Sequence, residues 1–353
     1  MDMAVVDVCF RDRRNCLSSA LSDIPAKVKT ADIVIHESQF PDNIRHHLVS
    51  SLRSRKINHK FHYDSVKQTQ KWLALHQIYS PSRNDENCRA IYENSFEAAA
   101  TKIKAKAVHI IGLGCGGGQK DTRLLELLKL RGKDIFYTPC DASTAMVLVA
   151  RQAALACLRE QNCFPFVCDL AVPDSLQKFL ANRHPSIITF FGMIPNFEPQ
   201  NVLPKLASLV RVKDRLLFSA NVAPGKNYAA GMEKILPQYD NPPTRDWLMT
   251  FLLDLGVEKN DGKLKFTIES GAFGLKRIVA RFHFIRPRQV ELESEYFKFC
   301  AGDSVRLFFS YRYTPERVRK LLKRHGLEVC GEWVTKSEEE AVFLAARRTS
   351  ARS

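Results

Sequence analysis

Short apolar runs alternate with amphipathic segments from residue 107 to residue 221, and this alternation restricts the fold more than any other feature of the sequence. A strand buried on both faces is a continuous apolar run, whereas a helix that covers a sheet has one apolar face. The pattern predicts a parallel, doubly wound α/β sheet. Strands are predicted over residues 107–114, 134–141, 164–170, 186–193 and 214–221, and helices over 121–132, 143–160 and 175–183.

The C-terminal part of the chain extends this pattern. Thr314 and Pro315 predict the start of a helix, since Thr is a favoured N-cap and Pro is tolerated in the first turn. Two apolar runs joined by a short polar turn follow at 327–335 and 339–347. A closing antiparallel hairpin after five parallel strands is the layout of the Rossmann-like class I methyltransferases, and plain dehydrogenase Rossmann domains lack it.

The interval 222–313 does not follow the alternation. It holds a helical segment at 245–257 and three strand-like runs, which predicts an inserted α+β subdomain. Ligands of such sheets bind at the carboxyl ends of the strands, so we expect this insertion to cover that edge together with the N-terminal region. The predicted division is an N-terminal helical segment contributing to the substrate domain (1–83), the core (84–221), the inserted α+β substrate-binding subdomain (222–313) and the return to the core (314–353).

The composition is that of a globular protein, with 353 residues of which 45% are hydrophobic. No run of eighteen apolar residues occurs, and Asp7 interrupts the apolar residues near the N-terminus, so we expect a cytoplasmic protein without a membrane partner. None of the ten cysteines forms a CxxC pair, which predicts packed, reduced thiols and no bound metal.

A net charge of +15 makes nucleic acid a partner to consider. The basic residues are dispersed, however, and no segment interleaves them with aromatic residues as an RNA-binding sheet would. The stretch DNPPT at 240–244 superficially resembles the motif of base methyltransferases but lacks the aromatic residue on which a flipped base stacks. We therefore expect a small-molecule substrate, with RNA or DNA base methylation as the less favoured alternative.

The glycine-rich stretch GLGCGGG at 112–118 follows a predicted strand and precedes a predicted helix. That context is the one a cofactor-binding loop requires, although a tight turn would use the same residues. Asp141 ends the second strand, where a carboxylate can accept hydrogen bonds from both ribose hydroxyls. Asp169 ends the third strand, near the expected adenine; either acid has a helix cap as its alternative role.

Lys120 directly follows the glycines. Dinucleotides place a pyrophosphate at this helix N-terminus, whereas S-adenosyl-L-methionine presents a zwitterionic amino acid tail. The open loop, two strand-end acids and the closing hairpin favour S-adenosyl-L-methionine. Lys120 is then placed to bind the carboxylate of the tail, with a solvated surface lysine as the alternative.

Five segments carry a family resemblance: HKFHYDSVKQTQKWLALHQIYSPSRND (59–85), IIGLGCGGGQKDTRLLELL (110–128), YTPCDAS (137–143), GMIPNFEP (192–199) and SYRYTPE (310–316). In this order they resemble the S-adenosylmethionine-dependent histidine-specific methyltransferases, the family of the histidine Nα-methyltransferase of ergothioneine biosynthesis. The resemblance covers roughly residues 35–345 and implies a methyl donor site built from Tyr79, Gly114, Lys120, Asp141 and Asp169. We expect the loop glycines Gly112 and Gly116 and the strand-end Leu170 to belong to the same site.

The resemblance also implies residues that hold the amine and carboxylate of an amino acid acceptor. These are Tyr63 in HYDS, Asn196 in MIPNF and Tyr239 in QYDN, of which Tyr63 and Asn196 are the candidate catalytic pair. Asn196 follows the fourth strand, from which class I enzymes usually address the methyl acceptor. Tyr63 and Tyr239 have packing roles as their alternative.

One position departs from the family. Its histidine enzymes have a glutamate, which holds the imidazole, two residues before a serine; here the serine is Ser310 and the glutamate position is Phe308. A phenyl ring accepts no hydrogen bond from imidazole, and the unpaired group would cost about 1–3 kcal/mol. We therefore expect an acceptor with a neutral or aromatic side chain, or another small amine.

The predicted reaction is in-line N-methylation that releases S-adenosyl-L-homocysteine, by a chain acting as a monomer. Positioning alone contributes roughly 7–11 kcal/mol to such a step, so no strong base is required. The alternative with the same cofactor is transfer of its 3-amino-3-carboxypropyl group.

Overall fold

The computed structural model describes residues 31–79, 85–171, 176 and 183–348, and the described residues from Ile33 onward belong to one compact unit. The helix predicted over 175–183 lies almost wholly outside the described residues, as do residues 1–30 and the SPSRN segment at 80–84. No helix in the described ranges is long and apolar enough to cross a membrane.

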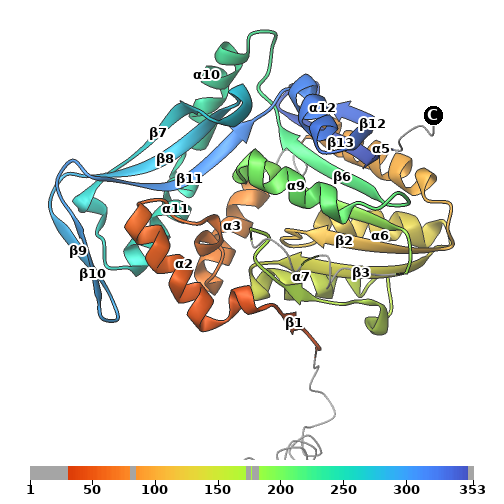
Figure 1. Ribbon diagram of the computed structural model, residues 1–353, viewed down its shortest axis with the longest axis horizontal. Helices are drawn as coiled ribbons and strands as arrows, with labels where there is room; N and C mark the ends of the chain where they lie inside the picture. The colour runs from red at the N-terminus through yellow and green to blue at the C-terminus, as the bar shows by residue number, and fades with distance from the viewer. Residues whose placement is uncertain (1–30, 80–84, 172–175, 177–182, 349–353) are drawn as a thin grey trace, which may run out of the picture. The chain divides into compact units, whose positions relative to one another are not determined.

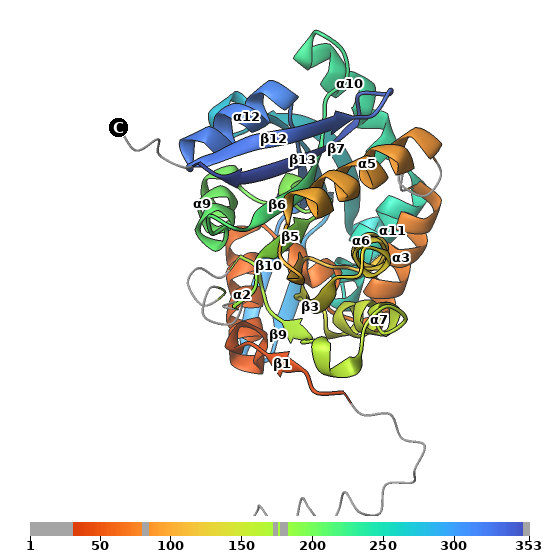
Figure 2. The ribbon, with the colours of Figure 1, turned by 90° about the vertical axis from the view of Figure 1, so that its right-hand side faces the viewer.

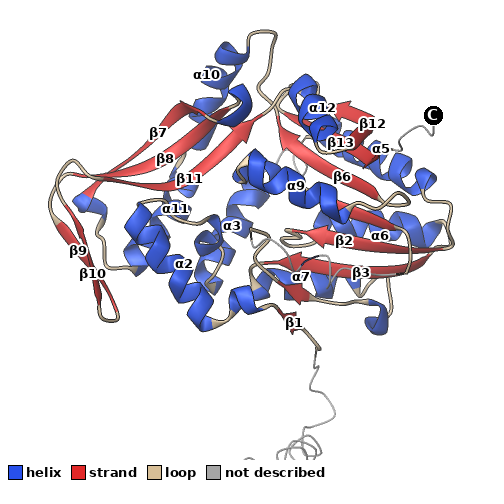
Figure 3. Ribbon diagram, viewed as in Figure 1, coloured by secondary structure: helices blue, strands red, loops and turns tan. Residues whose placement is uncertain are grey.

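The main sheet has eight strands in the order β1-β4-β3-β2-β5-β6-β13-β12 (Figures 1 and 3). Strands β1 to β6 pair in parallel, β13 runs antiparallel to β6, and β12 runs antiparallel to β13. The predicted doubly wound sheet with a closing hairpin is therefore confirmed. The strands are β1 (Val34–Ile35), β2 (Ala107–Leu113), β3 (Asp134–Asp141), β4 (Phe166–Val167), β5 (Ser186–Phe190), β6 (Arg215–Asn221), β12 (Leu327–Val334) and β13 (Glu340–Arg347).

Strand β4 is much shorter than the predicted 164–170. Pro165 has no N–H to give to a ladder, and the N–H of Asp169 donates to the hydroxyl of Ser38 instead of to a strand. The backbone leaves the sheet at this point, which places Asp169 and Leu170 beyond the carboxyl end of β4.

Helices cover both faces of the sheet (Figure 2). One face packs against the apolar sides of α9 and α12, and the other packs against α5, α6 and the end of α7. The buried strands thus contribute to two hydrophobic cores, as expected of a doubly wound fold. The helices are α5 (Glu86–Lys102), α6 (Gln119–Leu130), α7 (Thr144–Ala154), α9 (Pro199–Leu209) and α12 (Pro315–Arg324).

The inserted segment forms an antiparallel sheet in the order β11-β8-β7 and a separate hairpin of β9 and β10. Its buried side chains share one hydrophobic cluster with side chains of α2 and of the short 3₁₀ helix η2. This cluster supports the predicted division of the chain, which stays a prediction. The elements are α2 (Pro41–Ser54), η2 (His59–His62), α3 (Val66–Tyr79), α10 (Tyr228–Tyr239), α11 (Pro242–Asp254), β7 (Gly262–Ser270), β8 (Lys276–Phe284), β9 (Arg288–Leu292), β10 (Glu295–Phe299) and β11 (Ser304–Arg312).

Candidate functional site

A cavity of about 850 Å³ lies at the carboxyl ends of the parallel strands. Its wall combines the glycine loop and the ends of β3 and β4 with residues of η2, α3 and β11, and with the 3₁₀ helix η4 (Ile194–Asn196) that follows β5. The predicted site residues that line the cavity are Tyr63, Gly114, Gly116, Lys120, Asp141, Asp169, Leu170 and Asn196. The structure thus brings together residues from five separate segments of the sequence.

The glycine loop is constrained by the protein's own side chains as well as by the cavity. Gly114 and Gly116 have φ of +61° and +52°, in the left-handed region that favours glycine. A Cβ on Gly114 would come within 2.6 Å of the Met193 side chain. Gly112 does not line the cavity; a Cβ there would lie 2.1 Å from Oδ2 of the buried Asp121. Glycine is therefore required at position 112 by the packing of Asp121, and not by contact with a ligand.

Asp141 closes the glycine loop at the end of β3. Its Oδ2 accepts the N–H of Gly116 at 3.1 Å, and its Oδ1 accepts the N–H of Ser143 at 3.0 Å. Burial raises the pKa of this carboxyl, and the backbone N–H donors act in the opposite direction. Each oxygen keeps a second lone pair, so the carboxylate can also accept two hydroxyl groups from a bound ligand.

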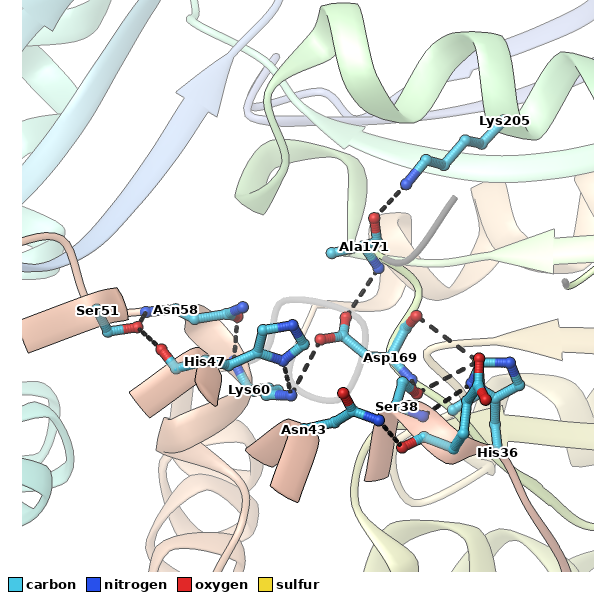
Figure 4. A network of polar contacts seen from close by, with 12 residues as sticks. His36, Ser38, Asn43, His47, Ser51, Asn58, Lys60, Asp169, Ala171 and Lys205 are labelled. Carbon is cyan, nitrogen blue, oxygen red and sulfur yellow. Dashed lines mark hydrogen bonds and ion pairs between the residues drawn. The ribbon is translucent and has the colours of Figure 1, made fainter. Parts of the chain in front are cut away.

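Asp169 is held by a lysine that the sequence reasoning missed (Figure 4). Lys60 Nζ lies 3.3 Å from Asp169 Oδ2, and each side chain is only 6% exposed. Asp169 Oδ1 accepts the N–H of Ala171 at 2.8 Å. Lys60 Nζ also lies 2.6 Å from His47 Nδ1, and burial followed by the Lys60 charge lowers the pKa of His47. A neutral His47 therefore accepts from the lysine.

Lys120 faces the cavity with an unexpected set of partners. Its Nζ donates to the Tyr92 hydroxyl at 2.7 Å and lies 3.8 Å from Oε1 of Glu340. The ammonium also sits 4.2 Å from the centre of the Tyr92 ring, a cation–π contact. Tyr92 lines the cavity as well and donates its hydroxyl proton to Glu340. A ligand carboxylate reaching Lys120 would thus meet a lysine already oriented by Tyr92 and Glu340.

Tyr63 and Asn196 lie on the wall of the same cavity. The Tyr63 ring packs between Trp72 and Trp247, with centroids 5.7 and 5.5 Å away. Burial and the charge of Asp141 raise the pKa of Tyr63 far above its usual range, so the hydroxyl stays protonated. The effect of the Asp141 charge on Tyr63 indicates that a predicted cofactor residue and a predicted acceptor residue lie close together.

Tyr239, Phe308 and Ser310 do not line the cavity. The Tyr239 hydroxyl donates to Ser310 Oγ at 2.9 Å, and Asn221 donates to both groups. Phe308 packs against Tyr239 and Trp247, at 6.1 and 6.0 Å between ring centroids. These residues form a layer behind the wall. The residues of β11 that line the cavity are Arg306 and Phe309.

Tyr79 also lies away from the cavity. It ends α3 with half of its surface exposed, and residues 80–84 next to it are not described. Its predicted role in cofactor binding stays a prediction.

The sheet order, the glycine loop and the strand-end acids together define a class I methyltransferase. Comparison with known families gives the particular assignment, because the family described as "histidine-specific methyltransferase, SAM-dependent" matches residues 42–252 and 267–347. The chain belongs to this family and is an S-adenosylmethionine-dependent methyltransferase. The resemblance inferred from the sequence segments is confirmed, and so is the predicted cofactor.

The chain is similar to the N-methyltransferase imqF of Aspergillus flavus, with 23% identity over 281 residues that cover 75% of this chain and 73% of the relative. It is also similar to the magnesium protoporphyrin IX methyltransferase ChlM from Synechocystis PCC 6803, with 13% identity, 82% and 98% coverage and a TM-score of 0.44. The glycopeptide N-methyltransferase MtfA gives 12% identity, 73% and 94% coverage and a TM-score of 0.36. Scores this low carry no conclusion about this chain.

Proposed function

We propose that this chain methylates the amine of a small amino acid or amino-acid-like acceptor whose side chain is apolar or aromatic. The similarity to an N-methyltransferase supports an amine acceptor. One observation carries the choice of side chain: Phe308 stands at the family's glutamate position and is buried among aromatic rings. Phe308 lies behind the wall of the cavity, so a polar imidazole would find no carboxylate on that side, whereas an apolar group needs none.

The residues at the cavity fit the proposed methyl donor. Asp141 can hold a ribose diol, Lys120 can pair with the carboxylate of the methionine tail, and Asp169 can accept from the adenine amino group. The backbone of Gly114 and Gly116 lets the ligand approach the loop closely, since no Cβ projects there. The donor supplies an electrophilic methyl group on a sulfonium, and the sulfide leaves as the C–S bond breaks.

The chain's own residues then position the acceptor. The Tyr63 hydroxyl and the Asn196 carboxamide oxygen can each accept a hydrogen bond from an amine, which fixes the direction of the nitrogen lone pair. The raised pKa of Tyr63 keeps its hydroxyl neutral, so it orients the amine without removing a proton from it. The nitrogen must reach the site unprotonated, and the proton that the methylated amine releases goes to solvent.

The test is an acceptor panel. The protein is incubated with S-adenosyl-L-methionine and, separately, each of the twenty amino acids and a set of biogenic amines, and the products are analysed by mass spectrometry. We expect a gain of one to three methyl groups on an acceptor with an apolar or aromatic side chain. The Asp141→Asn variant is the control, because turnover that depends on the donor site must fall in it.

Three outcomes would contradict the proposal. Methylation of histidine alone would show that Phe308 does not disfavour imidazole. An increment of an aminobutyrate unit would identify transfer of the 3-amino-3-carboxypropyl group. Methylation of RNA or DNA with no small-molecule product would favour a nucleic-acid substrate.

A further inference from the structure

Arg306 lines the cavity as a cation without a counter-ion. No described residue forms a hydrogen bond or ion pair with its guanidinium, and its Nε is buried without a partner. The guanidinium carbon lies 4.8 Å from the centre of the Phe309 ring, a cation–π contact with another residue of the wall. A half-buried cation with unmet donors is costly unless something else supplies the acceptor.

The backbone around Arg306 is fixed, so its side chain is presented to the cavity by a rigid strand. Its N–H donates to the carbonyl of Arg55 at 2.9 Å, and its own carbonyl accepts from Ile57 at 2.8 Å. These bonds tie β11 to the segment that connects α2 with η2. Because these two hydrogen bonds fix the backbone of Arg306, its side chain can be held in a defined geometry, as a binding residue requires.

The nearby carboxylates are already in use. Glu198 accepts from Arg277 at 2.7 Å and from the Tyr311 hydroxyl at 2.6 Å. Glu269 pairs with Arg277 at 3.4 Å and with Arg281 at 2.9 Å. Within this described cluster, Arg306 is thus the arginine that no carboxylate contacts; the charges of Glu198 and Glu269 act on it only from a distance, and burial still lowers its pKa.

His59 lies beside Arg306 with the same lack of partners. Its ring meets the Phe309 ring edge-on at 4.8 Å, and both ring nitrogens are buried without a hydrogen bond to any described residue. Burial, His62 and the Arg306 charge lower its pKa well below the usual range, so the ring is neutral and keeps one N–H donor. Both residues line one part of the cavity, with the two His59 nitrogens and Arg306 Nε buried within its wall.

We propose that Arg306 and His59 form a subsite for the carboxylate of an amino acid acceptor. A guanidinium binds a carboxylate through two parallel hydrogen bonds. The neutral His59 ring lies in the same wall, and a small turn of the ring would bring its unpaired N–H to the ligand as a third donor. The subsite lies at the acceptor side, since β11 packs against η4, which carries Asn196. It takes the role that the family resemblance gave to Tyr239, whose hydroxyl is instead bonded to Ser310 and Arg312.

This inference rests on the proposed function, and matched acceptors separate the two. For the amino acid with the highest kcat/KM, the same measurement is made on its carboxamide and on its decarboxylated amine. We expect kcat/KM to be about 10- to 100-fold higher for the carboxylate, as for a charge-assisted hydrogen bond. Arg306→Gln removes this preference, and Arg306→Lys restores part of it because the charge returns without the planar fork.

Arg281→Gln is the matched control, because Arg281 lies on the neighbouring strand, is paired with Glu269 and does not line the cavity. It should keep the preference of the wild-type protein. Equal kcat/KM for carboxylate, carboxamide and amine would overturn the subsite but leave amine methylation standing. A preference that survives Arg306→Gln, or falls equally in Arg281→Gln, would also overturn it.

Binding gives a readout that needs no turnover. Phenylacetate and phenylacetamide are titrated by calorimetry into the wild-type protein and the Arg306→Gln and His59→Phe variants, each saturated with S-adenosyl-L-homocysteine. Tighter binding of phenylacetate in the wild type alone supports the subsite. Equal affinity of the two probes in the wild type refutes it, even if no amino acid in the panel is methylated.

Discussion

Replacing Gly112 with alanine tests whether the first glycine of the loop is bare for an internal reason. The new Cβ would lie 2.1 Å from Asp121 Oδ2, whereas ordinary contacts begin at 3.4 Å. Asp121 must therefore move by more than an ångström. It is 3% exposed and accepts from the Tyr137 hydroxyl at 2.8 Å and from Thr189 at 2.7 Å.

The backbone of Gly112 offers no relief, because β2 is paired on both sides, with Pro139 and Thr189 opposite Gly112. Breaking a hydrogen bond to a charged group costs about 1.5–3 kcal/mol, and overpacking adds about 1–3 kcal/mol. We therefore expect Gly112→Ala to lower the free energy of unfolding by about 2.5–6 kcal/mol, which is a large share of the stability of a typical domain.

Urea unfolding followed by circular dichroism measures this loss. Gly117→Ala is the control, since its Cβ would meet only the movable amide of Gln119, and we expect a change within about 1 kcal/mol. The double variant Gly112→Ala/Asp121→Ala should be more stable than the sum of the single changes, because the clash disappears. A Gly112→Ala protein as stable as the wild type, or strict additivity, would refute the clash with Asp121.

Three more predictions concern buried charges. Lys60→Met should lower the free energy of unfolding by about 3–5 kcal/mol, because it leaves the buried Asp169 carboxylate without its ion-pair partner. Lys67→Met breaks an exposed pair and should lower it by less than about 1 kcal/mol. Equal urea midpoints for the two variants would contradict this prediction. Burial lowers the pKa of His62 from 6.5 to about 4, so the unfolded chain binds the proton more readily than the folded one. The free energy of unfolding should therefore fall by up to about 3 kcal/mol as the pH drops from 6.5 to 4. His62→Gln should reduce this fall in urea titrations at several pH values, and an unchanged pH dependence would exclude His62 as its cause. Asp141→Asn should weaken binding of S-adenosyl-L-homocysteine about 10- to 100-fold in calorimetry, and an unchanged Kd would remove Asp141 from the donor site.

The sheet was predictable because its signal is local. A strand buried on both faces has to be apolar throughout, and β3 occupies the residues predicted for it, 134–141. Asp141 was predictable for the same reason, as the polar residue that ends such a run. Helix α5 was missed: its buried residues are mostly small or aromatic, so the apolar face is weak in the sequence, and its packing on β12 and β13 stabilises it.

The partners of the site residues were not predictable. Lys60 is separated from Asp169 by more than a hundred residues, and Lys120 is still further from Glu340. Each pair exists only because the tertiary fold brings its two segments together, and a distance across the fold cannot be read from the local sequence pattern. Residue types with a recognisable spacing, such as the loop glycines, could be assigned; their charge partners needed the structure.

The arrangement of β11 shows how one irregularity decides which of its residues line the cavity. In a regular strand Arg306, Phe308 and Ser310 would share a face, because side chains alternate with a period of two. The register shifts between Arg306 and Phe308, and such a bulge exchanges the faces beyond it. The cavity therefore receives Arg306 and Phe309, and Phe308 turns into the cluster behind them.

The bulge is held from η2, since His62 Nε2 donates to the carbonyl of Leu307 at 2.7 Å, in the shifted segment. Phe308 can then act on the acceptor only through the rings it touches, His59 and Trp247, and not by direct contact with the cavity. The positions of Phe308 and Arg306 are therefore two consequences of one strand: under the proposed function, it puts a phenyl ring behind the wall where the family has a carboxylate, and it puts a cation in the wall for the acceptor's own carboxylate.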